Sequence, residues 1–387
     1  MLCEYGNKSM HNKDVSKKGM FFMEKIKNRI VITVTAAFLF AVSLACWLKE
    51  TDDYSEAERR YLKKFPSLTA DTVMNGKFMS EFETYSQDQF PGRDALRGLK
   101  SGVSLCVFLN RDNNDLYLEN GYIGKLEYPY RPEAIAYATK VFQNINSKYL
   151  EDTDCNVYYA IIPDKGYYLA EENGYLSMDY ELLEQDFCAG MKGMTYIDLF
   201  EVMHLEDFYR TDTHWRQEEL QDVAGVIAQT MGGNLDAEYD CVALEEPFCG
   251  VYHGQLALPI EGEVLYYLVN DELNQCYVYD YTNAKEIGMY DMEKAVGADP
   301  YEMYLSGSLS LITIENPDAD TDKELIIFRD SYGSSIAPLF AEEYAKITLV
   351  DVRYMHSGML GNYIEFEDQD VLFLYSTLVL NNSETLK

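Results

Sequence analysis

The segment Glu324–Phe340 reads ELIIFRDSYGSSIAPLF and contains the pattern that decides the fold. Its run Leu325–Phe328 is continuously apolar, as expected for a strand that is buried on both faces of a sheet. The polar turn Asp330–Gly333 comes next, and a helix is predicted over 334–345. We therefore expect a strand, a tight turn and a helix, with Ser331 exposed in the turn at the carboxyl end of the strand.

Apolar runs of the same kind recur from Leu105 onward and alternate with helical patterns. The strand-like runs cover 157–162, 347–352 and 371–375, and the helical patterns cover 132–149 and 217–231. Strands that alternate with helices predict a parallel sheet with helices on both faces. The predicted fold class is α/β, a three-layer α/β/α sandwich with a mainly parallel sheet.

Residues from about 235 to 320 have a different character. They are rich in Tyr, Gly and turn residues, and Cys276–Tyr281 (CYVYDY) alternates as a half-buried strand does. We expect either a β-rich insertion or an irregular half of the same domain.

The N-terminal sequence predicts a membrane anchor. Residues 1–29 hold seven Lys and Arg residues against three Asp and Glu residues, and the uncharged run Ile30–Leu48 follows directly. A run of that length matches the roughly 20 residues that span a bilayer, and positive charge before it places the N-terminus inside. A cleaved signal peptide is the alternative, although its apolar region is usually shorter.

The expected organisation follows from these patterns. Residues 1–29 form a cytoplasmic segment, 30–48 an anchor, 49–104 a stalk with lead-in helices expected around 55–64 and 78–90, and 105–387 an extracellular α/β domain. The net charge of −33 argues against nucleic acid and anionic lipid as partners, because phosphates would be repelled. A neutral glycan suits such a surface better.

Three residues form the candidate chemical centre. Ser331 in its strand-to-helix turn is placed as a nucleophile would be, and His214 within Tyr209–Trp215 (YRTDTHW) is the histidine with the most suggestive context. Asp212 can orient the imidazole so that its other nitrogen accepts the serine proton. The structural alternatives stay open: a helix-capping serine, a hydrogen-bonding histidine and a capping carboxylate.

Other chemistry has less support. The sequence contains no HExxH, CxxC, P-loop or GxGxxG motif, so no metal and no cofactor is predicted. Paired carboxylates for glycoside hydrolysis stay open, since spacing in sequence does not give separation in space.

Several short motifs together resemble a known family. In chain order they are Ser55–Arg60 (SEAERR), Phe65–Pro66, Gly76–Phe78 (GKF), Asp88–Asp94 (DQFPGRD), Pro163–Lys165 (PDK), Asp212–Trp215 (DTHW), Phe248–Gly250 (FCG), Asp330–Gly333 (DSYG) with Pro338, and Asp351–Tyr354 (DVRY). Their order and spacing resemble the DHHW proteins of mainly Gram-positive bacteria, which are related to the alginate O-acetyltransferases and more distantly to SGNH hydrolases. This chain departs from the family name at Thr213, where a histidine is expected.

The resemblance implies an SGNH-like fold with a permuted motif order and a triad of Asp212, His214 and Ser331. It also implies acetyl transfer to an exported polysaccharide, often beside a membrane-bound O-acyltransferase that supplies the acetyl groups. With water as acceptor the same site would be an esterase. A non-catalytic envelope protein that binds glycan or acts as a scaffold is the alternative function.

Five further residues are candidates for supporting roles. Backbone N–H groups around Ser331, Tyr332 and Gly333 are expected to stabilise an oxyanion, and Trp215 to wall the site against water. Lys165 and Arg353 each follow a predicted strand and are candidates for orienting substrate, with a structural ion pair as the alternative.

Overall fold

The structure is a computed structural model that describes the backbone of residues 4–387 and the side chains of residues 23–387. Residues 1–3 of the expected cytoplasmic segment, and the side chains of residues 4–22, lie outside the described part. The chain divides into two compact units. The first comprises Met1–Ser55 and Arg60–Leu96, and the second comprises Glu56–Arg59 and Arg97–Lys387.

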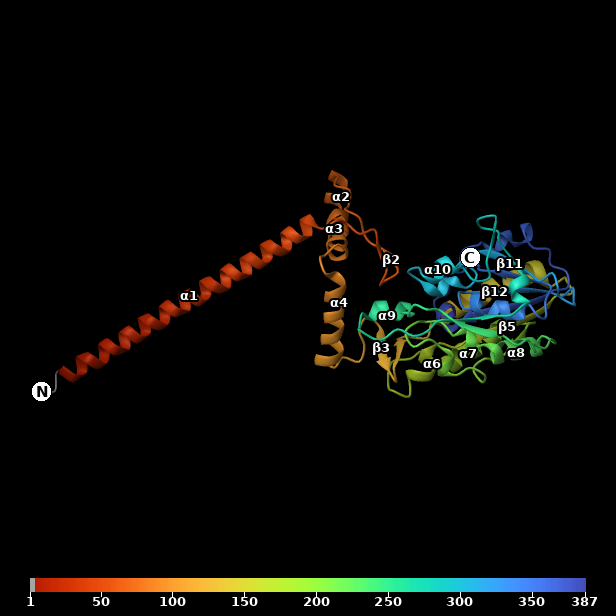
Figure 1. Ribbon diagram of the computed structural model, residues 1–387, viewed down its shortest axis with the longest axis horizontal. Helices are drawn as coiled ribbons and strands as arrows, with labels where there is room; N and C mark the ends of the chain where they lie inside the picture. The colour runs from red at the N-terminus through yellow and green to blue at the C-terminus, as the bar shows by residue number, and fades with distance from the viewer. Residues whose placement is uncertain (1–3) are drawn as a thin grey trace. The chain divides into compact units, whose positions relative to one another are not determined.

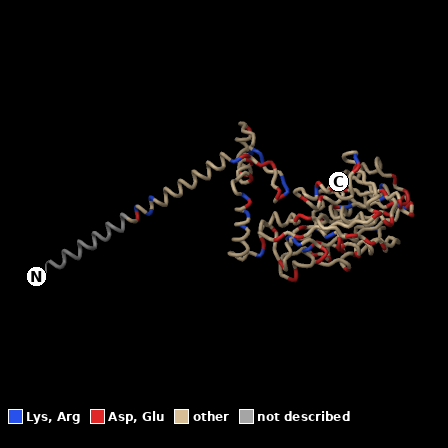
Figure 2. The backbone as a smooth tube through the Cα atoms, viewed as in Figure 1, with Lys and Arg blue, Asp and Glu red and all other residues tan. Residues whose placement is uncertain are grey.

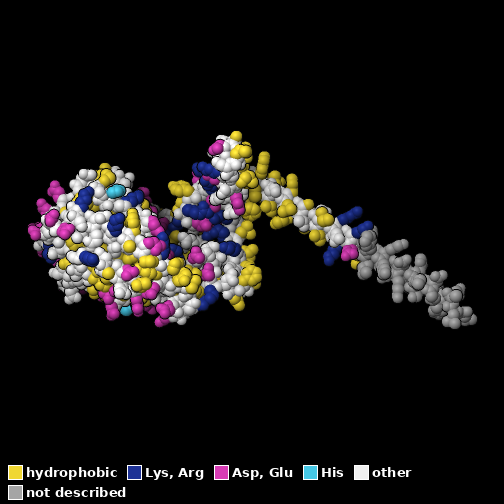
Figure 3. Space-filling model, turned by 180° about the vertical axis from the view of Figure 1, so that it is seen from behind, with side chains coloured by type: hydrophobic (Ala, Val, Ile, Leu, Met, Phe, Trp, Pro, Cys, Tyr) yellow, Lys and Arg dark blue, Asp and Glu magenta, His cyan; other side chains and the backbone are white. Residues whose placement is uncertain are grey.

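The first unit begins with a long helix, α1 (Glu4–Leu48). Its part Met23–Leu48 has 26 residues and a mean hydropathy of 2.3, and the protein buries none of its apolar stretch. This part is therefore long and apolar enough to cross a membrane. Figure 3 shows hydrophobic side chains along this helix beyond a group of Lys and Arg side chains. One N-terminal apolar helix is therefore present, as an anchor or a signal sequence requires.

The remainder of the first unit is short helices and a strand pair. Its elements are β1 (Tyr54–Ser55), β2 (Arg60–Tyr61), α2 (Ala70–Met74), α3 (Lys77–Asp88) and the start of α4 (Arg93–Gly102). A helix was expected over 55–64, and the structure instead has a turn between two strands. The buried carboxylate of Asp88 explains this, because it accepts two hydrogen bonds from Arg60 and one from the Lys63 N–H, at 2.6–3.0 Å.

An eight-stranded sheet forms the centre of the second unit (Figure 1). Its strands, in order across the sheet, are β10 (Lys285–Ile287), β9 (Tyr277–Asp280), β11 (Leu311–Glu315), β13 (Lys346–Val350), β12 (Glu324–Arg329), β14 (Asp370–Ser376), β5 (Asn156–Ile162) and β6 (Thr195–Ile197). The five strands from β13 to β6 are mutually parallel. β11, β9 and β10 extend the sheet with antiparallel pairing.

Helices cover both faces of this sheet, which makes three layers. On one face α8 (Gln221–Thr230) and α11 (Gly333–Ile336) pack against alternate strand residues such as Leu325 and Ile327. On the other face α5 (Pro132–Ile145) and α7 (Tyr180–Gly190) pack against Ile326 and Phe328. Because β12 is buried on both sides, its sequence is continuously apolar. The predicted α/β fold class with a mainly parallel sheet is confirmed.

Smaller elements surround the sheet. They are β3 (Leu116–Glu119), β4 (Tyr122–Lys125), α6 (Lys165–Leu169), β7 (Asp240–Ala243), α9 (Val251–Leu256), β8 (Tyr266–Val269), α10 (Met292–Ala295) and α12 (Thr377–Leu380). The region 235–320 supplies β9, β10 and β11 to the main sheet, and its β7 and β8 form a separate pair. Figure 2 shows Asp and Glu spread throughout this unit.

The helix expected over 334–345 is shorter than predicted. α11 ends at Ile336 and continues as a 3₁₀ turn over Ala337–Phe340. Pro338 lies in this turn, and proline lacks the N–H that an α-helix needs. All seven cysteines from Cys46 onward, within the described side chains, are free thiols.

Candidate active site

Ser331 lies at the carboxyl end of β12, in a turn that Asp330 holds. One carboxylate oxygen of the fully buried Asp330 accepts the Tyr332 N–H at 3.0 Å. The other accepts the N–H and the hydroxyl of Ser376, at 2.9 and 2.7 Å. Asp330 therefore fastens the turn to the end of β14, and Ser331 is left partly exposed between two buried neighbours.

His214 and Asp212 are brought to Ser331 by the loop that precedes α8. His214 Nε2 lies 2.8 Å from Ser331 Oγ, and His214 Nδ1 lies 2.6 Å from Asp212 Oδ2. The carboxylate beside Nδ1 favours a proton on that nitrogen, so that Nε2 can accept the serine proton. The Tyr301 ring stacks on the imidazole, with centroids 3.8 Å apart and planes 7° apart. The Tyr332 ring also contacts the imidazole, with centroids 5.0 Å apart, so four side chains surround it.

Asp212 is fully buried and is held as a carboxylate. Burial alone would raise its pKa, but His214, then Arg59 and the Val251 N–H, together hold the pKa well below its usual value. The Val251 N–H donates to Asp212 Oδ1 at 2.6 Å. An ionised carboxylate at this place can stabilise an imidazolium next to it.

Arg59 reaches this carboxylate from far away in the sequence. Its Nη1 lies 3.6 Å from Asp212 Oδ1 and 2.8 Å from Asp299 Oδ2, and its Nη2 donates to the Cys249 carbonyl at 3.0 Å. The side chain is only 9% exposed. Arg59 also has a left-handed φ of 51°, a conformation that residues with a side chain keep only when the surroundings impose it.

Gly250 allows a close approach to Asp212. A Cβ atom at this position would lie 2.2 Å from the Cβ and 2.4 Å from the Cα of Asp212. The φ of Gly250, −69°, suits any residue, so space and not backbone conformation requires glycine here. The motif Phe248–Gly250 therefore has a physical role that the sequence did not reveal.

Trp215 lies beneath the serine turn. It is fully buried, and its indole N–H lies 3.1 Å from the Tyr332 carbonyl and 2.8 Å from Ser335 Oγ. The Tyr332 hydroxyl in turn donates to the Thr213 carbonyl at 2.6 Å. These contacts connect the loop that carries His214 to the turn that carries Ser331, so Trp215 helps to hold the two segments together.

The expected oxyanion donors already have acceptors within the turn. The Tyr332 N–H donates to Asp330 Oδ1, and the Gly333 N–H donates to the Asp330 carbonyl at 3.2 Å. Within the described part of the chain, the Ser331 N–H has no such partner. It is the backbone donor of this turn that remains open to a bound group.

Lys165 and Arg353 contact protein groups. The buried Lys165 ammonium donates to the carbonyls of Tyr209 and Arg210, at 2.9 and 3.2 Å, and so anchors the loop that leads to Asp212. Burial lowers the pKa of Lys165 to about 7. Arg353 pairs with Asp351 through two nitrogens, at 2.9 and 2.7 Å. Arg353 thus forms an ion pair, whereas Lys165 is held by two carbonyls and not by an ion pair. A substrate-orienting role stays a prediction for both residues.

Comparison with solved structures identifies the fold. A DHHW family protein from Eubacterium siraeum superposes with a TM-score of 0.58 at 19% identity, over 71% of this chain and 95% of that one. The chain has the fold of a DHHW family protein. Bacillus cereus PatB1 is also similar, with a TM-score of 0.55 at 17% identity over 69% of this chain and 97% of PatB1.

A second PatB1 structure, solved with a sulfonyl adduct, gives a TM-score of 0.53 at 16% identity. It covers 68% of this chain and 97% of PatB1. No protein-family model matches the chain, and no curated protein matches it by sequence. The shared DHHW fold thus rests on three-dimensional similarity, in agreement with the sequence motifs.

Proposed function

We propose that the chain moves acyl groups, acetyl above all, to or from a cell-surface polysaccharide outside the membrane. The observation that carries the proposal is the hydrogen-bonded series of Ser331, His214 and Asp212 at the carboxyl end of β12. A hydroxyl, an imidazole and a buried carboxylate in this order are the parts that acyl transfer through a serine ester needs.

In the first step Ser331 Oγ attacks the acyl carbonyl as its proton passes to His214 Nε2. The resulting imidazolium is stabilised by Asp212, and the Ser331 N–H is placed to stabilise the oxyanion. The tetrahedral intermediate collapses to an acyl-serine, and the leaving group takes the proton from His214. A sugar hydroxyl then attacks the acyl-serine as its proton passes to His214. The bond between Ser331 Oγ and the acyl carbon breaks, Ser331 Oγ takes that proton from His214, and the acylated sugar leaves.

The setting of the reaction belongs to the same proposal. α1 serves as an uncleaved anchor, with Lys25, Lys27 and Arg29 on the inner side of its apolar part and the second unit outside. The organisation 1–29, 30–48, 49–104 and 105–387 then separates a cytoplasmic segment, an anchor, a stalk and an α/β domain. A membrane-bound O-acyltransferase would supply the acetyl groups, and an exported polysaccharide would be the acceptor.

The test uses the full-length protein in detergent with p-nitrophenyl acetate as donor and neutral glycan fragments as acceptors. We expect nitrophenol release and glycan fragments heavier by one acetyl group, and Ser331→Ala should lower both rates by about 10³-fold or more. Ser334→Ala is the matched control, because the Ser334 hydroxyl is buried without a hydrogen-bond partner in the described part of the chain. Equal rates in wild type and Ser331→Ala would refute the proposal.

A further inference from the structure

A second polar hollow runs along β11 and β13, and Ser331 is not among its lining residues. Glu324 and Lys346, the first residues of β12 and β13, line one end, which at about 3.3 Å per strand residue is roughly 20 Å from Ser331. The other end reaches Leu311, which pairs with Val350, and Val350 pairs with Phe328, three residues before Ser331. The hollow has a volume of about 350 Å³, within the range of sites for small molecules.

Two threonine residues line this hollow with hydroxyl groups that have no protein partner among the described side chains. Thr313 and Thr348 are paired across β11 and β13 and are 3% and 5% exposed. Among the described side chains, neither hydroxyl takes part in a hydrogen bond. Neither oxygen is one of the fully buried unpartnered side-chain atoms of the described chain, so both hydroxyl groups are open to the hollow. A ligand with hydroxyl groups could form hydrogen bonds with both.

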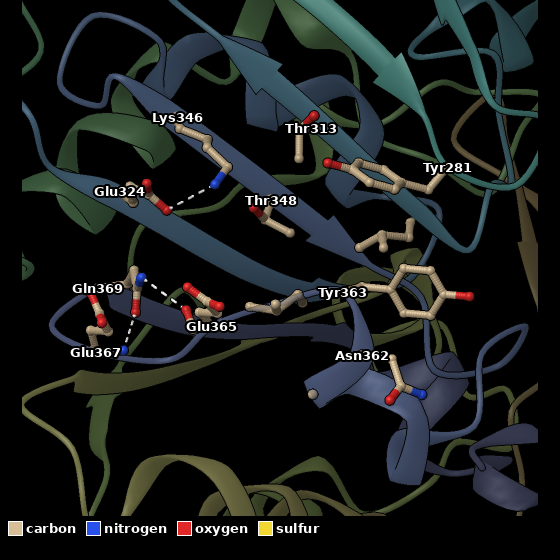
Figure 4. A pocket seen from close by; sticks show the side chains of 13 residues that line it. Tyr281, Thr313, Glu324, Lys346, Thr348, Asn362, Tyr363, Glu365, Glu367 and Gln369 are labelled. Atoms are coloured by element: carbon tan, nitrogen blue, oxygen red, sulfur yellow. Dashed lines mark hydrogen bonds and ion pairs between the residues drawn. The ribbon is translucent and has the colours of Figure 1, made fainter.

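Two tyrosine rings border the same hollow. Tyr281 and Tyr363 are 38% and 48% exposed, and their ring centroids lie 6.4 Å apart with planes at 84°. Figure 4 shows these rings at one end, the Lys346 and Glu324 pair at the other, and the threonines between them. A tyrosine ring combines an apolar face with a polar tip, which suits a ligand that has both C–H surfaces and hydroxyl groups.

The charge of the hollow restricts its occupant. Lys346 is already paired with Glu324 at 3.2 Å, and Glu365 and Glu367 add two further acidic residues to the lining. An anionic sugar would meet this acidic surface without a free cation to bind it, so its binding is disfavoured. Hydroxyl partners, exposed rings and negative charge together favour a neutral saccharide.

We propose that this hollow, the Thr313–Thr348 pocket, binds a neutral saccharide unit of a glycan separately from the serine site. The proposal does not rest on catalysis, and a Ser331→Ala variant should bind as the wild type does. If the glycan is also the acceptor, a second attachment point raises its effective concentration at Ser331.

The test measures binding by isothermal titration calorimetry on the full-length protein in lauryldimethylamine oxide, a detergent without a sugar headgroup. The neutral probes are N-acetylchitotetraose and cellotetraose, and the anionic probe is tetragalacturonate. We expect at least one neutral probe to bind with a millimolar Kd or tighter and tetragalacturonate to bind at least 10-fold more weakly.

Two variants locate the binding, each with a matched control. Tyr363→Ala and the nearly isosteric Thr348→Val should each weaken binding at least 10-fold, and a thermal unfolding curve shows whether each variant is folded. Tyr61→Ala and Thr195→Val remove an exposed ring and an exposed strand threonine elsewhere, and should leave the Kd unchanged. No binding of either neutral probe, stronger binding of tetragalacturonate, or an unchanged Kd in both pocket variants would overturn the proposal.

Discussion

Arg59 Nη1 lies 3.6 Å from Asp212 Oδ1, so a residue from the segment between β1 and β2 faces the carboxylate that holds His214. The same guanidinium pairs with Asp299 at 2.8 Å. It therefore binds both the fully buried Asp212 and the partly exposed Asp299, and this arrangement leads to the first prediction.

Replacing Arg59 should change the pH dependence of the reaction. The charged groups around Asp212 are His214, Arg59, Asp299 and Lys165. In Arg59→Gln the two carboxylates lose their shared cation, so the pKa of the pair rises and the acid limb of the kcat/KM profile moves to higher pH. Nitrophenol release from p-nitrophenyl acetate between pH 4 and pH 9 measures this.

A double variant separates this electrostatic effect from a packing effect. Arg59→Gln with Asp299→Asn removes one carboxylate as well as the cation, so the acid limb should return toward its wild-type position. An acid limb that stays in the Arg59→Gln position in the double variant would show that lost packing, and not charge, causes the change.

Asp212→Asn should lower kcat/KM by about 10⁴-fold, as expected when the orienting carboxylate of such a triad becomes an amide. The amide no longer fixes the proton on His214 Nδ1, so Nε2 ceases to be a reliable acceptor for the serine proton. Initial rates with p-nitrophenyl acetate give the ratio. Asp222→Asn, at an exposed position of α8, is the control and should keep wild-type rates; a comparable loss in both variants would contradict the role of Asp212.

Gly250→Ala should displace Asp212 and lower activity, although the change adds only one methyl group. Its Cβ would lie 2.2 Å from the Asp212 Cβ, so the loop must shift, at a cost of about 1–3 kcal/mol of folding free energy. We expect at least a 10-fold loss of kcat/KM. The control is Gly225→Ala in α8, where nothing lies within 4 Å of the added atom and a slight stabilisation is expected. Full activity in Gly250→Ala would show that the close approach to Asp212 is not required.

Lys165 should make the free energy of unfolding rise with pH. Its pKa is about 7 in the folded chain and about 10.4 in the unfolded chain, so between these values the unfolded state binds one proton more. This group should therefore add about 1.4 kcal/mol per pH unit above pH 7 and nothing below it. Urea titrations at pH 6, 8 and 9, followed by fluorescence of the buried Trp215, measure the slope.

In Lys165→Met this slope should disappear, whereas Lys140→Met, at an exposed position, should keep it. Parallel stability curves for wild type and Lys165→Met would contradict the assigned protonation of the buried ammonium.

The sequence predicts the centre of this fold well because the middle residues of β12, β14 and β5 are buried on both faces of the sheet and are therefore apolar. It does not predict the turn at 55–64, because the partner that decides it, Asp88, is distant in sequence. The helix after Ser331 is shorter than expected because Pro338 interrupts it.

The candidate site also combines residues that a sequence motif reveals with residues that only the fold brings together. Asp212 and His214 share one motif, and Ser331 has a recognisable turn, so the sequence predicts all three as candidates. The structure places them within hydrogen-bond distance of one another, and their catalytic role stays a prediction. The sequence does not predict Arg59, Tyr301 and Asp299, because folding alone brings them to the carboxylate and the imidazole. Tyr301 and Asp299 belong to none of the motifs, and the SEAERR motif that contains Arg59 does not by itself indicate a role in chemistry.

Acyl transfer through Ser331 requires that the acyl group be found on this residue. Full-length protein is mixed with p-nitrophenyl acetate, quenched with acid and analysed by peptide mass spectrometry. We predict an increase of about 42 Da, one acetyl group, on the peptide that contains Ser331 in wild type, and no such increase in Ser331→Ala. A protein that releases nitrophenol as fast after Ser331→Ala, or that carries acetyl on another residue instead, would contradict the account.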